Sequence, residues 1–319
     1  MIGELLKVAD IEIDGGVEIV TSLKVEDLNG ESRRSTDIPL SFTIPEEASI
    51  EKMFLDLTVV GETRNWRVYI GDFSLTKEFK PTLSGSMGNS IIHKFIFDVT
   101  PTKHVVLSDP VLRVVNNSNS PIKVIQSSIV VFYSYKDLGQ AHYYYGVSMR
   151  PFRALSGSLD PVKSGKIYSV VYSRDRNNIK AKVGPCVSEV SFVGTEEIEL
   201  ECSKGGGYAL EGTSEFVPLT LVLGSFSYNL PKLTLETDRS SNKIKIVIKN
   251  EGSKADKVLV ILYSSGAVLD RKDLGELNEG EAKELEFETG KFKDVLVMGI
   301  RLLWVKGKMR GTVDKLIPL

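Results

Sequence analysis

Short apolar segments separated by turn-forming residues are the feature that most limits what this chain can fold into. Residues 38–44 alternate so that Leu40, Phe42 and Ile44 share one face, and residues 17–25 alternate in the same way. Segments of this kind return along the chain at a spacing of roughly 8–12 residues, which is typical of strands joined by tight turns. No window carries apolar residues at the spacing of an amphipathic helix. We therefore predict an all-β protein.

The chain is long enough for two or three domains. It has 319 residues, of which 42% are hydrophobic, enough to build full cores. About eight strands in residues 1–150 predict a jelly-roll-like β-sandwich. A polar stretch begins at Pro151, so residues 151–228 form a second β region, which either completes the first domain or folds as a small one. A further boundary lies at residues 229–231, and residues 229–319 form a C-terminal sandwich.

Charge and hydropathy argue against two kinds of partner. The 40 Lys and Arg residues and 42 Asp and Glu residues give a net charge of −2, whereas a nucleic-acid-binding protein carries a basic surface. No segment approaches about 18 consecutive apolar residues, so we expect no membrane span. Residues 1–20 lack the charged start and apolar core of a signal peptide. The sequence leaves open whether Met1 is the natural start.

The two cysteines, Cys186 and Cys202, flank a segment with the pattern of a β-hairpin. Residues 187–193 and 197–201 have strand composition, with a break at Gly194. Pairing across that break would bring the cysteines close enough for a disulfide. The alternative is two small buried apolar residues that lie near each other. Two cysteines are too few for a zinc site of their own.

Residues 243–287 carry a set of turn motifs. A strand over residues 247–252 ends in Asn-Glu-Gly, a second strand covers residues 259–263, and a Leu-Asn-Glu-Gly-Glu turn covers residues 277–281. These motifs resemble the CARDB domain, the immunoglobulin-like "cell adhesion related" module of archaeal and bacterial surface proteins. The resemblance implies an immunoglobulin-like sandwich over residues 229–319.

Three residues of these motifs suit tight turns. Asn250, Gly252 and Gly280 belong to the residue types that tolerate positive φ.

At residues 44–48 and 98–100 the first part of the chain is similar to jelly-roll ectodomains of archaeal surface proteins. The resemblance implies an extracellular or cell-surface protein without catalytic residues, acting in adhesion, surface scaffolding or glycan contact.

Two tyrosine-rich segments form the candidate ligand-binding site. They carry Tyr133 and Tyr135, and Tyr143 and Tyr145, on either side of a short turn over residues 136–141. We expect the two segments to pair as a hairpin, with alternate side chains on opposite faces. Exposed tyrosine rings would stack on sugars or contact a protein. The alternative is ordinary aromatic packing between strands.

Calcium is the one cofactor that the sequence suggests. Asp109 with Asn117, or Asp175 with Asn177, would supply the oxygen ligands that Ca²⁺ prefers, although Asp and Asn are also common in turns. The three histidines lack the spacing of zinc ligands. The sequence shows no nucleophile elbow and no phosphate-binding loop.

Three functions fit these observations. The first is a non-enzymatic structural or adhesion protein that contacts protein, glycan or a second copy of itself. The second is a self-assembling virion or filament subunit, in which residues 1–16 would form a free arm that adds to a neighbour's sheet. The third is a carbohydrate-binding module or a glycoside-active enzyme, which needs a groove with facing carboxylates or exposed aromatic rings. The even mix of Lys and Glu with few His and Cys suits a thermophile.

Overall fold

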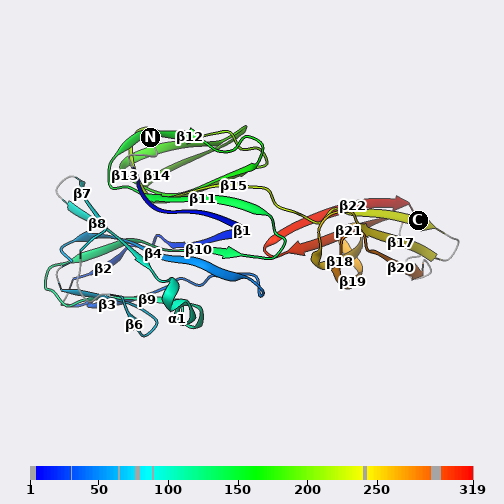
Figure 1. Ribbon diagram of the computed structural model, residues 1–319, viewed down its shortest axis with the longest axis horizontal. Helices are drawn as coiled ribbons and strands as arrows, with labels where there is room; N and C mark the ends of the chain where they lie inside the picture. Colours follow the sequence, from blue (N-terminus) through cyan, green and yellow to red (C-terminus); the bar gives the residue numbers. More distant parts are fainter. Residues whose placement is uncertain are drawn as a thin grey trace. The chain divides into compact units, whose positions relative to one another are not determined.

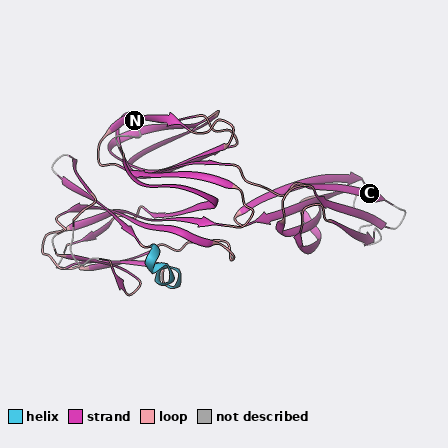
Figure 2. Ribbon diagram, in the orientation of Figure 1, coloured by secondary structure: helices cyan, strands magenta, loops and turns pink. Residues whose placement is uncertain are grey.

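The structure is a computed structural model that describes residues 5–29, 31–63, 65–75, 80–87, 90–239, 243–288 and 296–318. Within these residues the chain is almost entirely β-strand, with one short helix, α1 (Lys103–Ser108), and a 3-10 turn at Thr100–Thr102 (Figure 2). The prediction of an all-β fold is confirmed. No helix of the described part is long and apolar enough to cross a membrane.

The chain divides into two compact units. The first comprises Met1–Thr43, Glu47–Ser134 and Gln140–Ser227, and the second comprises Ile44–Glu46, Tyr135–Gly139 and Tyr228–Leu319.

The first unit contains strands β1 to β15 (Figure 1). Their bounds are β1 Leu6–Ser22, β2 Glu26–Leu28, β3 Ser35–Pro39, β4 Ser49–Gly61, β5 Trp66–Ile70, β6 Phe73–Ser74, β7 Leu83–Met87, β8 Ser90–Asp98, β9 Val111–Asn116, β10 Ile122–Ser134, β11 Gln140–Val147, β12 Phe152–Ser158, β13 Ser164–Val183, β14 Cys186–Cys202 and β15 Gly207–Phe226.

Among the described residues, eleven of these strands form one sheet in the order β14-β13-β15-β11-β1-β10-β4-β8-β7, with β12 beside β15 and β2 beside β10. A separate sheet has the order β3-β9-β5-β6. Because β15 pairs with β11, residues 151–228 continue the same sheet as the strands before them.

Strand β1 joins the two halves of the large sheet. Residues 6–14 pair with β11, and residues 15–22 pair with β10 (Figure 1). The change of partner falls at Gly15, where a Cβ atom would lie 1.9 Å from the carbonyl oxygen of Tyr133, so no larger residue fits. From Leu6 onward the N-terminal residues are therefore strand inside the sheet. A free arm over residues 1–16, which would point to a virion or filament subunit, is therefore not what this described part forms.

The same strand separates the two tyrosine-rich segments. β1 lies between β10 and β11 in the sheet, so these two strands do not pair with each other. The predicted hairpin across residues 136–141 is therefore wrong. The cause is a pairing with a segment more than a hundred residues away, which local sequence does not reveal.

Three neighbouring strands, β13, β14 and β15, bend near their middles. A straight strand of 17 residues would span about 50 Å, yet the Cα atoms of Cys186 and Cys202, at the two ends of β14, are 5.8 Å apart. The bend lies where the pairing shifts between Ser173 and Asn177 of β13, opposite Gly194, which has a φ of 84°. The folded halves enclose an apolar core that includes Ile167, Val171, Ile179, Phe192, Leu210, Phe216 and Leu221. This end of the sheet is thus a sandwich made by folding it over.

The large sheet also rolls around an aromatic core. The ring of Phe54 on β4 lies 5.7 Å from that of Tyr145 on β11, and the ring of Phe132 on β10 lies 5.9 Å from that of Tyr143. β1 and β10 separate β11 from β4 in the sheet order, so side chains meet here only because the sheet curves. Rings at these separations and tilts pack favourably.

The second unit is a sandwich of two sheets, β16-β17-β20 and β19-β18-β21-β22. Isoleucines of β17 and alternate residues of β18 and β21 face each other in its core. The bounds are β16 Leu233–Arg239, β17 Lys243–Asn250, β18 Ala255–Ser264, β19 Ala267–Leu277, β20 Ala282–Glu288, β21 Val297–Lys306 and β22 Met309–Pro318.

Asn250 ties the turns of this sandwich together. Its side chain is fully buried. Its Oδ1 accepts hydrogen bonds from the backbone of Lys232 at 3.2 Å and of Gly252 at 3.1 Å, and its Nδ2 donates to the carbonyls of Ser253 at 2.7 Å and Leu277 at 3.0 Å. A buried amide with all these partners satisfied holds its loops in one conformation.

Two of the three expected positive φ angles are corrected. Gly280 has a φ of 74°, as expected, but Asn250 and Gly252 are not among the positive-φ residues. Asparagine is needed for its hydrogen bonds, and Gly252 for space, because a Cβ there would lie 2.5 Å from the carbonyl oxygen of Leu230.

Candidate functional site

A polar groove opens on the exposed face of β1 and β11 in the first unit. It encloses about 400 Å³ and we name it the β1–β11 groove. Its lining residues are Glu12, Ile13, Asp14, Gln140, Ala141, His142 and Lys163.

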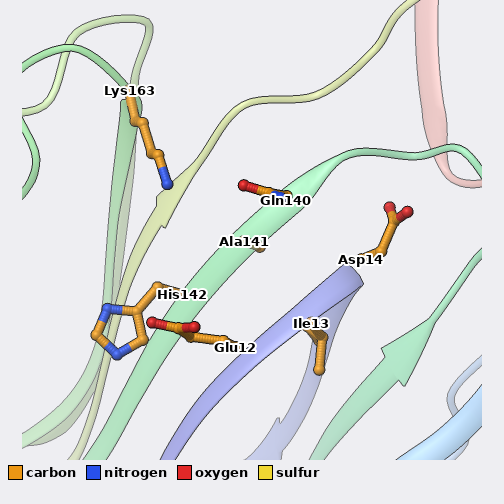
Figure 3. Close-up of a pocket in the computed structure, with 7 residues that line it drawn as sticks. All are labelled: Glu12, Ile13, Asp14, Gln140, Ala141, His142 and Lys163. Atoms are coloured by element: carbon orange, nitrogen blue, oxygen red, sulfur yellow. The ribbon is translucent and has the colours of Figure 1, made fainter.

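Strand alternation places the polar side chains of this groove on one face. Glu12 lies opposite His142, and Asp14 lies opposite Gln140, in the pairing of β1 with β11. Figure 3 shows the carboxylate of Glu12 beside the imidazole of His142, with Ile13 pointing to the other side of the strand. Because successive residues of a strand face opposite ways, the exposed acidic residues of β1 share one face, while Ile11 and Ile13 are half-buried on the other.

Next to the groove, the ion pair of Lys7 and Asp10 fixes the position of His142. Nε2 of His142 lies 2.6 Å from Oδ1 of Asp10, and Nζ of Lys7 lies 3.2 Å from Oδ2 of the same carboxylate. The hydrogen bond from His142 lowers the pKa of Asp10 and outweighs the opposing effect of its partial burial. Asp10 therefore stays ionised and holds the imidazole of His142 through Nε2.

The groove offers hydrogen-bond donors and acceptors within a short distance of each other. Glu12 and Asp14 accept, Lys163 donates from above the strands in Figure 3, and Gln140 does both. Ligands rich in hydroxyl or amide groups match such a set. In the described residues no three His, Cys, Asp or Glu side chains are grouped so that they could hold a metal ion.

The four tyrosines that the sequence suggested as ligand-binding residues are buried. Their exposed fractions are 4% for Tyr133, 9% for Tyr135, 1% for Tyr143 and 0% for Tyr145. Rings with so little exposed surface cannot stack on a sugar or dock a partner, so the prediction of a tyrosine contact face is wrong. The alternative, aromatic packing inside the fold, is what the structure shows.

Each tyrosine has its own internal contact. Tyr143 packs against Phe132 of β10 in the same sheet, and a Cβ on Gly16 would lie 2.7 Å from the Tyr133 hydroxyl. The hydroxyl of Tyr135 donates to Asp256 within the second unit at 2.7 Å. The hydroxyl of Tyr145 also finds a carboxylate within 2.7 Å, on β4.

The first calcium candidate pair is far apart. Asp109 precedes β9 and Asn117 follows it, so the length of this strand, about 20 Å, separates them. They cannot share an ion, whose ligands lie within about 2.6 Å of it.

The second pair is occupied with other contacts. The side-chain amide of Asn177 is buried and links β13 to β15. Its Nδ2 donates to the carbonyl of Ser214 at 3.0 Å, and its Oδ1 accepts from the N–H of Ser214 at 3.2 Å. Asp175 lies in a second pocket together with Arg153 and Arg174, whose positive charges disfavour a cation.

Cys186 and Cys202 are joined by a disulfide. The geometry differs from the expected hairpin, because residues 187–193 and 197–201 do not pair with each other but both pair with β13. The fold in the sheet, rather than a turn between two strands, brings the sulfurs together.

Sequence reasoning missed the acidic side of the groove. Asp10, Glu12 and Asp14 recur at every second residue of β1, which is the signal of three carboxylates on one strand face. Gln140, His142 and Lys163 show no comparable pattern in the sequence, because only the fold brings them beside these carboxylates.

Comparisons with known proteins give no family assignment. No family model matches the chain, and no curated protein matches it. Among solved structures, β-glucuronidase of Ruminococcus gnavus is similar at 9% identity and a TM-score of 0.23, over 59% of this chain and 37% of that chain. Its complex with D-glucuronic acid has the same identity and TM-score over 59% of this chain and 38% of the other. Its complex with a C6-substituted uronic isofagomine is similar at 8% identity and a TM-score of 0.23, over 58% of this chain and 37% of the other.

This chain therefore spans well under two thirds of those glucuronidases. Similarity at this TM-score carries no argument about the function of this chain.

Proposed function

We propose that this chain is a non-enzymatic structural or adhesion protein that works outside the cell by contact with a glycan or protein surface. The observation that carries the proposal is the β1–β11 groove. Glu12, Asp14, Gln140 and His142 project from two paired strands, and the opposite face of β11 packs in the core. Binding groups on rigid strands lose little conformational freedom when a ligand docks.

The placement outside the cell rests on the disulfide. Disulfides form and persist in oxidising compartments and are rare in the cytosol, and Cys186 and Cys202 are the chain's only cysteines. The resemblance of residues 243–287 to CARDB modules supports the same placement, and it stays part of the proposal.

The test is a binding measurement on the purified protein against a panel of immobilised oligosaccharides. Wild-type protein should bind at least one glycan class. Glu12→Ala and His142→Ala should each weaken that binding at least tenfold, because each removes a side chain that forms a hydrogen bond with the ligand. Glu189→Ala is the matched control, because this exposed carboxylate on β14 is outside the groove. Binding that survives both groove substitutions would contradict the assigned site.

The same sample separates the other functions. Light scattering should give a small discrete species, whereas closed particles or long polymers would favour a virion or filament subunit. New reducing ends in the bound glycans would identify a glycoside-active enzyme. Absence of binding to every glycan in the panel would overturn glycan contact and leave protein contact to be tested.

A further inference from the structure

Two opposite charges lie in full burial inside the first unit. Lys94 on β8 and Asp56 on β4 form an ion pair through Nζ and Oδ1, and both side chains have 0% exposure. The two strands are paired neighbours, with Lys94 opposite Thr58 and Asp56 opposite Ile96. A lone buried ion pair carries a large desolvation penalty, so its environment needs an explanation.

The amine of Lys94 is held by neutral acceptors. Nζ donates to Oε1 of Gln126 at 2.7 Å and to Oγ1 of Thr58 at 3.0 Å. Burial lowers the pKa of Lys94, while the charge of Asp56 opposes that effect. Burial therefore favours the uncharged form of Lys94, an amine with a free electron pair.

The other oxygen of Asp56 is held by two hydroxyl donors. Thr220 donates to Oδ2 at 2.6 Å and Tyr145 donates to it at 2.7 Å. Burial, together with the charge of Asp56, raises the pKa of Tyr145 well above its usual value, so its hydroxyl keeps its proton. One carboxyl oxygen thus contacts the amine, and the other lies between two fixed donors.

We propose that Lys94 and Asp56 condense into an intramolecular amide, an isopeptide bond between Nζ and Cγ that links β8 covalently to β4. The geometry places an amine against a carboxyl group, with donors aimed at the oxygen on which negative charge would develop during attack.

The step balances without any further reactant. A proton moves from the ammonium of Lys94 to Oδ1 of Asp56, and the electron pair of Nζ then forms a bond to Cγ. The electrons of the carbonyl bond move onto Oδ2, where the hydroxyls of Thr220 and Tyr145 stabilise them. The electron pair on Oδ2 re-forms the carbonyl as the bond from Cγ to Oδ1 breaks, Oδ1 takes a second proton from the nitrogen, and water leaves. The product is a neutral amide in place of two buried charges.

The packing around the pair favours the product. Phe54 and the ring of Tyr145 lie 5.7 Å apart beside this cluster, and an apolar site removes the advantage that bulk water gives to separate charges. Fixed proximity of the two reacting groups converts the condensation into a unimolecular step.

The decisive experiment is the intact mass of the wild-type chain, measured after reduction and denaturation. We expect a mass lower than that of the sequence by one water, about 18 Da. Trypsin should then release residues 53–64 joined to a peptide that contains Lys94 and runs to Lys103, because an acylated lysine is not cleaved. A full, unmodified mass with two separate peptides would overturn the proposal, and so would a lost water that maps elsewhere.

Substitutions test the assignment. Lys94→Met should restore the full mass expected for its sequence, whereas Lys52→Met, at a half-exposed lysine on β4, should still lose water. If Lys94→Met fails to fold, the wild-type mass and peptide map decide the question without it.

Tyr145→Phe tests the donor role, since it keeps the ring and removes the hydroxyl. In a time course of pulse-labelled protein, its cross-linking should be at least about tenfold slower than in wild type. An equal rate would overturn the role given to Tyr145.

Discussion

Thr220 Oγ1 donates a 2.6 Å hydrogen bond to Oδ2 of Asp56, although β11, β1 and β10 lie between their strands in the sheet order. Residues 164 positions apart in the sequence meet because the sheet rolls. Gln126 extends the network, since its Nε2 donates to Ser128 at 2.7 Å and to Thr220 at 3.1 Å. The centre of the first unit is therefore a buried polar cluster within an aromatic core.

Thr220→Val should destabilise the first unit by about 1–3 kcal/mol, because it leaves a buried oxygen of Asp56 short of a donor. Urea unfolding followed by tryptophan or tyrosine fluorescence measures this change. Thr195→Val, at a half-buried position on β14, is the matched control and should change stability by less than about 0.5 kcal/mol. Equal effects of the two substitutions would show that the hydroxyl of Thr220 matters little.

Reduction of the disulfide should loosen the folded-over end of the sheet. Cys186→Ser with Cys202→Ser removes a cross-link that spans 16 residues, and we expect a loss of about 2–4 kcal/mol in the free energy of unfolding. Wild type in reductant should match the double variant, and reductant should not affect the variant itself. A wild-type protein as stable with reductant as without it would contradict a stabilising role of the disulfide.

Asn250→Ala should destabilise the second unit by about 3 kcal/mol, since it leaves buried backbone donors and acceptors unpaired. The comparison is Asn278→Ala, which removes an exposed hydrogen bond to Glu281 and should cost less than about 1 kcal/mol. Thermal unfolding of both variants beside wild type decides between a structural role for Asn250 and an incidental one.

Acid should weaken the first unit through Glu26. Burial favours the neutral acid, yet the hydrogen bond from Lys24, the charge of Arg33 and a hydrogen bond from Thr36 outweigh it, so the pKa of Glu26 lies below its ordinary 4.5. A lowered folded-state pKa stabilises the fold above that ordinary value, and the stabilisation is lost as the pH falls through the folded-state pKa.

Glu26→Gln should accordingly be less stable than wild type at neutral pH and lose less stability on acidification. Urea unfolding at pH 7 and at about pH 3 measures both effects. Glu31→Gln, at an exposed position, should follow the wild-type pH dependence. A Glu26→Gln variant that loses as much stability in acid as wild type would refute the assignment.

Local sequence patterns predicted the strands but not their partners. Alternation in residues 17–25 predicts a strand, and residues 17–22 of it lie in β1. The pairing of β1 between β10 and β11 joins segments over a hundred residues apart, and nothing in either segment specifies that neighbour. The same holds for the groove, where alternation of Asp10, Glu12 and Asp14 marks a polar face but does not place Lys163 beside it.

The tyrosines show why exposure is hard to read from sequence. Tyr143 and Tyr145 alternate as residues of a half-exposed strand do, yet the sheet curls over them and leaves 1% and 0% of their surfaces exposed. Conversely, Asn250 lies in a sequence typical of an exposed turn, yet its side chain is buried. The loops around it supply four backbone hydrogen-bond partners.

By itself the sequence determined that the protein is all-β, since side-chain period and turn residues act within a few neighbouring positions. Tertiary structure alone decided which strands pair, where the sheet folds and rolls, and which polar residues meet. Asp56, Lys94 and Thr220 illustrate the difference, because each is unremarkable in its own strand and gains its chemistry only when burial removes water and brings the other two within reach.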